Sequence, residues 1–251
     1  MLKAVIIGSG NVAQHLIKAF LNSKKIELVQ VYTRNSEAVT HLLASNKITN
    51  SLNSISEADI YIIAVSDDAI ADISLKLPFT DRLVVHTSGS VALEQLDTKN
   101  RRGVFYPLQT FSKNKEVDFS KIPLCLESEQ SNDYKILEET AKAISPLLYT
   151  IDSRQRQSLH VAAVFVNNFT NHMYTIGNQI CNKNAIPFDI LRPLIQETAA
   201  KIELLTPLEA QTGPAKRKDE KTIEKHLKFL KDDNQKAIYT LLTQSIQKTD
   251  V

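Results

Sequence analysis

The chain has 251 residues, of which 43% are hydrophobic, so it can form two domains or one domain with a large extension. Its 30 basic residues nearly balance its 28 acidic residues, which provides no overall positive field to attract nucleic acid. No apolar run approaches the roughly 20 residues of a membrane span. The two cysteines, Cys125 and Cys181, form no metal-binding, redox or disulfide motif. We therefore expect a cytoplasmic protein with no signal peptide, no membrane or nucleic-acid partner and no bound metal.

Residues 2–21 have the pattern of a strand, a glycine-rich turn and a helix. The apolar run at residues 4–7 predicts a buried parallel strand, and GSGNVA at 8–13 fits the dinucleotide-binding pattern G-x-G-x-x-G/A. In this pattern the first glycine permits a tight turn, the second lets the backbone approach a pyrophosphate, and the helix N-terminus binds the phosphates. We therefore predict pyrophosphate binding by Gly8, Ser9, Gly10, Asn11 and Val12. The alternative is a tight turn in a similar fold that binds another nucleotide or none.

The predicted second strand, residues 26–32, ends where dinucleotide specificity is usually decided. An acidic residue there would accept hydrogen bonds from the adenine ribose of NAD, and residues 30–36 contain none. Arg34 can instead bind a 2′-phosphate, with Thr33 or Ser36 as a hydroxyl donor. This pattern favours NADP as the cofactor, unless Arg34 is an ordinary exposed arginine.

The next segments alternate between strand and helix patterns. We expect helices over residues 37–44 and 134–143, and strands at 48–49, 59–65, 83–87, 103–111, 122–126 and 147–151. Pro107 predicts an edge or a bend in its strand. The alternation predicts an α/β fold, a doubly wound and largely parallel Rossmann sheet covered on both faces, over residues 1–152.

Polar residues follow two of these strands at the edge where parallel strands present ligands. We expect Val65, Ser66 and Thr87 to lie near the nicotinamide ribose, and Ser88 to contact substrate. His86 has a side chain that titrates near neutrality, so it is a candidate proton carrier. The alternative is a strand histidine that bonds to the backbone.

Residues 153–251 show helical spacing, interrupted by prolines, with no clear strand pattern. They predict an all-α domain with helices at 154–182, 188–205, 219–230 and 234–247. A helix over 154–182 is too long to be buried by one small domain. We therefore expect it to pack along the sheet edge and against a second subunit in a homodimer.

This long predicted helix contains His160, Asn167, Asn171 and Tyr174 at spacings that place them on one face. Buried polar groups cost stability unless they are bonded or used. They could orient a carbonyl or an imine, with His160 or Tyr174 as the proton source, or they could form a polar network between helices or subunits. Arg217, in the basic loop at 211–219, could bind an anionic substrate or be merely solvated.

Five segments carry a resemblance to a known family: GSGNVA, HTSGS at 86–90, YPLQTFS at 106–112, HVAAVFVNNFTNHMY at 160–174 and TGPAKRKD at 212–219. The chain resembles Rossmann proteins with an uncharacterised C-terminal domain, commonly labelled NADP- or deazaflavin-dependent oxidoreductases. The architecture is similar to pyrroline-5-carboxylate reductase and the β-hydroxyacid dehydrogenases. The resemblance implies a C-terminal helical domain that dimerises, with the active site between the two domains.

The β-hydroxyacid dehydrogenases have a lysine four residues before an asparagine on the long helix. Here the residues four before Asn167, Asn168 and Asn171 are Ala163, Val164 and Asn167, so that mechanism does not transfer.

The function that we expect is hydride transfer between NADPH and a small carbonyl or imine compound. His160, Asn167, Asn171 and His86 are the candidate catalytic residues, and Ser88, Tyr174 and Arg217 the candidate substrate contacts. One alternative is an imine reductase of the pyrroline-5-carboxylate type. Another is a protein that binds NADP as a sensor or scaffold and performs no chemistry.

Overall fold

The computed structural model describes residues 1–113 and 115–249, which form two compact units, Met1–Val164 and Phe165–Val251. The N-terminal unit is built on an eight-stranded sheet with the order β3-β2-β1-β4-β5-β6-β7-β8. Its strands are β1 (Leu2–Ile7), β2 (Ile26–Tyr32), β3 (Ile48–Thr49), β4 (Ile60–Ile63), β5 (Leu83–His86), β6 (Arg101–Pro107), β7 (Leu124–Ser128) and β8 (Leu148–Thr150).

All neighbouring strands in this sheet are parallel except β6 and β7, which are antiparallel. The strand order reverses between β1 and β4, so the ligand crevice of a doubly wound sheet is expected at the carboxyl ends of these two strands. The predicted Rossmann-type α/β fold is confirmed.

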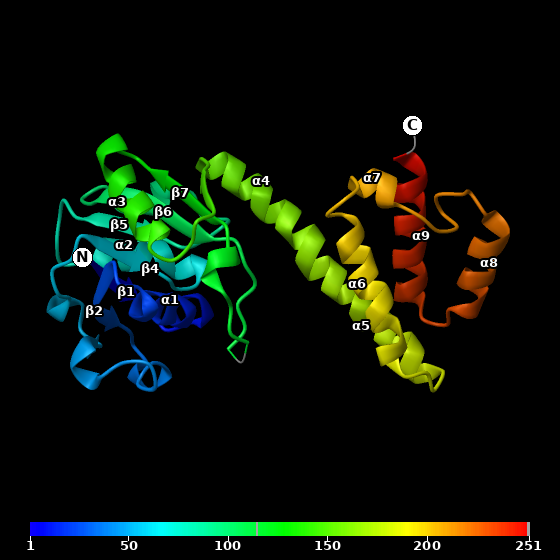
Figure 1. The fold of residues 1–251 in the computed structure, drawn as a ribbon, viewed down its shortest axis with the longest axis horizontal. Helices are drawn as coiled ribbons and strands as arrows, with labels where there is room; N and C mark the ends of the chain where they lie inside the picture. The colour runs from blue at the N-terminus through cyan, green and yellow to red at the C-terminus, as the bar shows by residue number, and fades with distance from the viewer. Residues whose placement is uncertain (114, 250–251) are drawn as a thin grey trace. The chain divides into compact units, whose positions relative to one another are not determined.

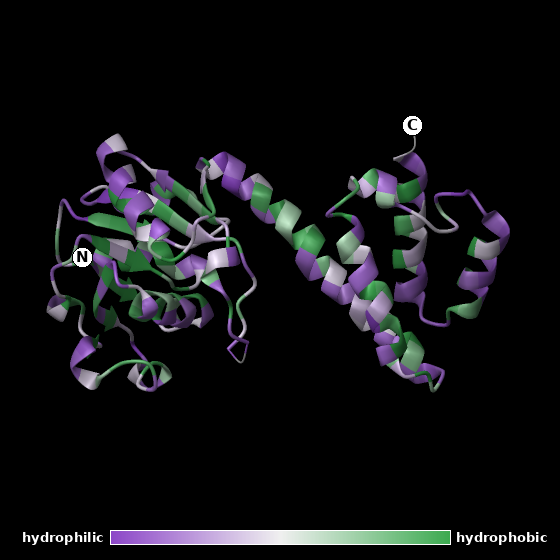
Figure 2. Cartoon of the chain, viewed as in Figure 1, coloured by the Kyte–Doolittle hydropathy of each residue, from purple (hydrophilic) through white to green (hydrophobic). Residues whose placement is uncertain are grey.

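Helices cover both faces of the sheet (Figure 1). Ala4 and Ile6 of β1 belong to one hydrophobic cluster with α1 (Asn11–Asn22) and α3 (Ser131–Lys142). Val5 and Ile7 belong to the other cluster, with α2 (Ile70–Lys76). Successive strand residues point to opposite faces, so an uninterrupted apolar run is what a strand covered on both faces requires. Figure 2 shows these strands in hydrophobic colours.

Two local predictions are wrong. Residues 37–44 do not form an α-helix: a 3₁₀ turn at Ser36–Ala38 is followed by turns, and Val39 and Leu43 are buried against the core. A segment this short has little helical stability of its own, so packing decides its conformation. Nor does Pro107 mark an edge strand, because β6 lies between β5 and β7. Pro107 is the last residue of β6, where its missing N–H group does not interrupt the strand.

Helices dominate the C-terminal part of the chain, as predicted. The helical run begins in the N-terminal unit with α4 (Ser153–Ala163), continues as a π-helix (Val164–Phe169) and becomes α5 (Thr170–Lys183). The other helices are α6 (Arg192–Lys201), α7 (Pro207–Ala210), α8 (Glu220–Phe229) and α9 (Asp233–Lys248). The predicted helix over 188–205 is shorter than expected: a 3₁₀ turn at Phe188–Leu191 precedes α6.

The two compact units divide at Val164, within the helical run. The predicted division after residue 152 coincides with the N-cap of α4, where Asp152 accepts a hydrogen bond from Gln155 N. The beginning of α4 belongs to the N-terminal unit because Ser153 and Arg156 bond to Glu127 of β7. In the described part of the chain no helix combines the length and the apolar character that a membrane span requires.

Candidate functional site

The glycine loop has the geometry of a phosphate-binding turn. Gly8 has φ +138°, and a Cβ atom there would lie 2.1 Å from the Ala64 carbonyl oxygen, so only glycine fits. A Cβ atom at Gly10 would meet nothing within 4 Å, and among the described residues no side chain caps the N-terminus of α1. The first turn of α1 also contains no acidic residue. The free N–H groups and positive dipole end of α1 can therefore receive an anion, and the open space at Gly10 fits a pyrophosphate.

The end of β2 provides a free cation beside this loop. The Thr33 hydroxyl group donates to Ser9 Oγ at 2.8 Å and accepts a hydrogen bond from Asn35 N, and Thr33 is buried. Arg34 is exposed and forms no hydrogen bond or ion pair within the described residues. Thr33 therefore shapes the loop, whereas the Arg34 guanidinium group is available to a ligand.

The segment after β6 contacts the first half of α1. Asn11 Nδ2 donates to Phe111 O at 3.0 Å, and His15 Nε2 lies 3.0 Å from Ser112 O. The motif at 106–112 therefore links the end of β6 to the start of the helix that follows the glycine loop. The Asn11 side chain is engaged in this contact, which leaves its backbone N–H group for a phosphate.

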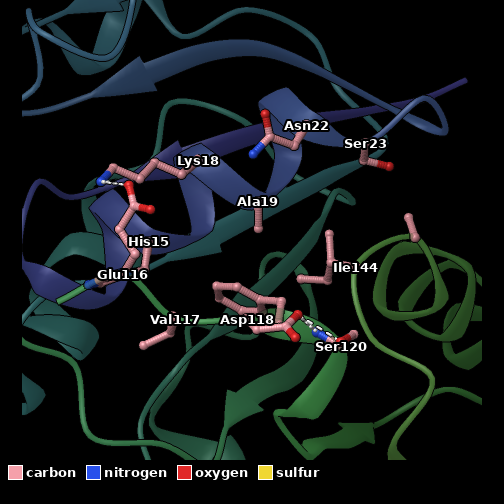
Figure 3. A pocket seen from close by; sticks show the side chains of 12 residues that line it. His15, Lys18, Ala19, Asn22, Ser23, Glu116, Val117, Asp118, Ser120 and Ile144 are labelled. Carbon is pink, nitrogen blue, oxygen red and sulfur yellow. Dashed lines mark hydrogen bonds and ion pairs between the residues drawn. The ribbon is translucent and has the colours of Figure 1, made fainter.

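A separate cavity of about 340 Å³ lies beside α1 (Figure 3). His15 and Lys18 of α1 line it, together with the segment at 116–120, and Lys18 forms an ion pair with Glu116. None of the predicted site residues lines this cavity.

The loop after β5 is held by its own hydroxyl groups. Ser88 Oγ accepts hydrogen bonds from Ser90 N (3.1 Å) and Val91 N (3.0 Å), and the Ser90 hydroxyl group donates to the Asp67 carboxylate. Thr87 and Ser88 are both buried. By contrast, Val65 is half-buried and Ser66 is exposed at the end of β4. In this structure the Ser88 hydroxyl group maintains the loop conformation.

His86 is completely buried in β5. Ser88 N donates to its Nδ1 atom at 3.2 Å. Burial, together with the nearby positive charge of Arg156, lowers the pKa of His86 to about 3. The imidazole is therefore neutral at physiological pH and has no exposed surface through which to exchange a proton with a substrate. This environment favours the interpretation of His86 as a strand histidine bonded to the backbone.

Three motifs meet in what we call the Gly89–Tyr106–His160 cluster. The Tyr106 hydroxyl oxygen lies 3.3 Å from His160 Nδ1, and the two rings meet edge-on with centroids 6.4 Å apart. A Cβ atom at Gly89 would lie 2.7 Å from both His160 Nδ1 and Tyr106 Cζ. The loop after β5, the end of β6 and α4 therefore converge on one polar site.

Tyr106 was not among the residues predicted for the site. A signal was present, because Tyr106 precedes the last residue of β6, and β6 runs parallel to β5. Residues 86–88 are predicted for the site because they lie at the carboxyl end of β5, and Tyr106 lies at the same end of β6.

A buried ion pair attaches α4 to this site. Arg156 is fully buried, and its guanidinium group pairs with the Glu127 carboxylate. Arg156 also donates to Val91 O at 2.6 Å and to Ser153 Oγ at 3.0 Å. The first turns of α4 are thereby bonded to β7 and to the loop that contains Gly89. Nothing in the local sequence distinguishes Arg156 from an exposed helical arginine.

The remaining predicted site residues lie in the C-terminal unit. Asn167 is exposed within the π-helix, Asn171 is exposed in α5, Tyr174 is half-buried in α5, and Arg217 is exposed in the loop before α8. The prediction that His160, Asn167, Asn171 and Tyr174 share one helical face assumed an uninterrupted α-helix, whereas Val164–Phe169 form a π-helix. A π-helix closes i→i+5 turns and shifts the side chains that follow it. Among the described residues, no cluster of His, Cys, Asp and Glu could hold a metal ion.

Two segments of the chain match two family models. Residues 3–89 match the family described as NADP oxidoreductase, coenzyme F420-dependent, and residues 122–246 match a domain of unknown function (DUF2520). No curated protein matches the sequence.

Solved structures resemble the chain over nearly its whole length. A protein from Bacteroides fragilis, provisionally named NADP oxidoreductase, is 40% identical, with 98% of each chain covered and a TM-score of 0.87. The NADP-bound pyrroline carboxylate reductase of Plasmodium falciparum is 12% identical, covering 99% of this chain and 96% of its own, with a TM-score of 0.64. An imine reductase variant from Myxococcus stipitatus, in complex with NAD+, is 15% identical, covering 99% and 94%, with a TM-score of 0.62. The last two show the shared fold. The match to the Bacteroides fragilis protein shows more: this chain belongs to the NADP oxidoreductase family that joins an F420-dependent-type nucleotide-binding domain to a DUF2520 domain.

Proposed function

We propose that this protein is an NADP-dependent oxidoreductase that transfers a hydride between NADPH and a small carbonyl or imine compound. The observation that carries the proposal is the geometry of the glycine loop: a backbone that only glycine can adopt at Gly8, and open space beside an uncapped helix N-terminus at Gly10. Bound NADPH would supply the hydride.

The proposed cofactor contacts follow from the exposed and free groups around this loop. The backbone N–H groups of residues 9–12 bind the pyrophosphate, and Arg34 binds the 2′-phosphate as a charge-assisted pair. Thr33 contributes by holding Ser9 in place. Val65, Ser66 and Thr87 follow the ends of β4 and β5, at the edge where a doubly wound sheet binds its ligand, which supports them as the proposed contacts of the nicotinamide ribose. The imine reductase with bound NAD+ and the pyrroline carboxylate reductase with bound NADP, both of similar fold, are consistent with this arrangement.

We propose substrate-binding groups in each unit by itself: His160 in the N-terminal unit, and Asn167, Asn171, Tyr174 and Arg217 in the C-terminal unit. His160 has one ring nitrogen bonded within the cluster, so the other can meet a substrate. Asn167 and Asn171 are exposed amides that can orient a carbonyl or imine, with Tyr174 and Arg217 as further contacts. Asn167→Ala should then abolish turnover with NADPH affinity near wild type; a loss of folding instead would make Asn167 a structural residue.

The experiment that tests the cofactor assignment is a calorimetric titration of the protein with NADPH and with NADH. An Arg–phosphate pair contributes about 1.5–3 kcal/mol, which is tenfold or more in Kd. Arg34→Ala should remove most of this preference for NADPH. The matched control is Arg154→Ala, because Arg154 is also exposed. If neither nucleotide binds, the glycine loop serves another ligand and the proposal fails.

A second measurement separates an enzyme from a sensor. NADPH consumption is followed against a panel of small aldehydes, ketones and cyclic imines. Turnover with any of them supports the oxidoreductase, whereas tight NADPH binding with no turnover across the panel supports a non-catalytic NADP-binding protein.

We also propose that the protein is a homodimer formed through its C-terminal helices. Large apolar side chains are exposed on and near the π-helix, including Phe165 (63% exposed) and Val166 (75% exposed). Exposed large apolar side chains that gather in one segment are typical of interaction sites. A second copy of the chain would cover them.

A further inference from the structure

We propose that Tyr106 is a positioning residue whose hydroxyl group holds His160 in the tautomer with its proton on Nε2, so that the site presents an N–H donor suited to a carbonyl oxygen. The inference deepens the proposed function, on which it rests: it selects a neutral carbonyl compound as the substrate class over a protonated imine. The hydrogen bond itself can be tested without any turnover.

The contact that supports this inference is the 3.3 Å approach of the Tyr106 hydroxyl group to His160 Nδ1. Tyr106 is 9% exposed, and burial raises the pKa of its hydroxyl group. The group therefore stays protonated near neutral pH and is available as a donor. When it donates to Nδ1, a neutral imidazole must carry its own proton on Nε2.

The two side chains have little freedom to leave this arrangement. Gly89 packs its bare backbone against them, and any side chain there would collide with His160 Nδ1 and Tyr106 Cζ. The backbone of α4 is fixed as well, because Arg156, one turn before His160 on the same helical face, bonds to Val91 O and Glu127. The imidazole is therefore held on its Nδ1 side by Tyr106 and Gly89, and its backbone is held by the contacts of α4.

His160 Nε2 remains free for a ligand. This atom has no hydrogen-bond partner within the described residues, and it is not buried, so a ligand can reach it. An N–H group at this position donates to a carbonyl oxygen. A protonated imine offers only its own N–H group to Nε2, so two donors would face each other.

In the reaction that this geometry favours, the carbonyl carbon would accept a hydride from NADPH bound at the glycine loop, which would be left as NADP+, and the carbonyl π electron pair would pass to oxygen. The Nε2–H group stabilises the negative charge that develops on this oxygen, which then takes a proton from water. A preorganised donor of this kind contributes on the order of 100-fold to a rate.

The first arm of the test is ¹⁵N NMR of the histidine side chains at pH 8, where a free imidazole is neutral. His160→Gln assigns the His160 signals among the six histidines. In the wild type we expect the chemical shifts of a protonated Nε2 and a bare, hydrogen-bonded Nδ1. Tyr106→Phe should produce a mixture of both tautomers. Tyr149→Phe, at an exposed tyrosine of β8, should change nothing. A wild-type proton on Nδ1, or identical His160 shifts in Tyr106→Phe, overturns the proposal.

Tyr106→Phe keeps the ring that packs with Leu93, Val104 and Cys125, so it should fold. Gly89→Ala provides a second variant, because its methyl group must displace the pair and should also mix the tautomers. Gly177→Ala is the matched control: its methyl group would meet Phe188 only at 3.8 Å. Unchanged His160 shifts in Gly89→Ala would contradict the packing described here.

The second arm is kinetic. With carbonyl substrates, Tyr106→Phe should lower kcat/KM by 10- to 100-fold with the Kd for NADPH unchanged. Cyclic imines should be turned over poorly by the wild type. Better turnover of imines than of carbonyls overturns the assigned substrate class. If no substrate consumes NADPH, the proposed function fails, while the NMR arm still decides the role of Tyr106.

Discussion

The buried ion pair of Arg156 and Glu127 connects α4 to the sheet, and its contribution to the free energy of unfolding can be measured. We consider Arg156→Met, Glu127→Met and the double variant. Arg156 has no exposed surface, and the Glu127 side chain is 16% exposed. Each single substitution leaves one charge in the protein interior without its partner, and breaking a buried pair in this way costs roughly 3–5 kcal/mol. Glu127→Met should cost more than Arg156→Met, because a carboxyl group can take up a proton whereas a guanidinium group cannot lose one.

The double variant should be destabilised much less than the two single variants together. It leaves no unpaired charge. Its losses are the neutral hydrogen-bond partners that the two side chains served, Val91 O and Ser153 N, and each unsatisfied group costs about 1–3 kcal/mol in the single variants as well. The coupling between the two positions should therefore be at least about 2 kcal/mol.

The assay is urea unfolding followed by far-UV circular dichroism, since the chain contains no tryptophan. Asp189→Asn is the control, because it breaks the exposed pair of Asp189 and Arg192, worth less than about 1 kcal/mol. Additive effects of the two single substitutions, or costs no larger than that of Asp189→Asn, would refute the reasoning from burial.

Three further predictions concern the glycine loop, the β5 histidine and the exposed apolar surface. Gly8→Ala should lower the free energy of unfolding by roughly 3 kcal/mol or prevent folding. Gly10→Ala should leave the Tm unchanged and raise the Kd for NADPH at least tenfold. Normal NADPH affinity in Gly10→Ala would contradict the phosphate site. Because the pKa of His86 is lowered to about 3, the unfolded chain binds a proton below pH 6.5 that the folded chain does not. The free energy of unfolding should therefore fall with decreasing pH, by about 2 kcal/mol from this group at pH 5. His86→Asn should lack this component, and the same pH dependence of the urea midpoint in both proteins would disprove it. Val166→Glu should convert the proposed dimer to a monomer in sedimentation equilibrium. Leu75→Glu, at an exposed leucine of α2, should not change the mass. A wild-type protein that is monomeric at micromolar concentration would contradict the dimer.

The sequence was sufficient for features that depend on neighbouring residues. The apolar run of β1, the two glycines and the helically spaced apolar residues of α1 (Ala13, Leu16, Ile17 and Phe20) specify a strand, a turn and a helix. The repetition of such units along the chain predicts the α/β sheet. The lack of acidic residues at the end of β2, which favours NADP, is likewise visible without the tertiary structure. The same kind of signal is present at Tyr106, which lies next to the last residue of β6, beside β5.

Only the tertiary structure determined which polar residues are buried and which of them meet. His86 and Arg156 resemble ordinary polar residues of a strand and a helix until the fold removes them from water. Tyr106 and His160 are 54 residues apart in the chain, and Arg156 and Val91 are 65 apart. The π-helix also interrupts the 3.6-residue periodicity from which an α-helix is predicted. Burial, hydrogen bonding and pKa depend on contacts between distant segments, and those contacts exist only once the hydrophobic core has brought the strands and helices together.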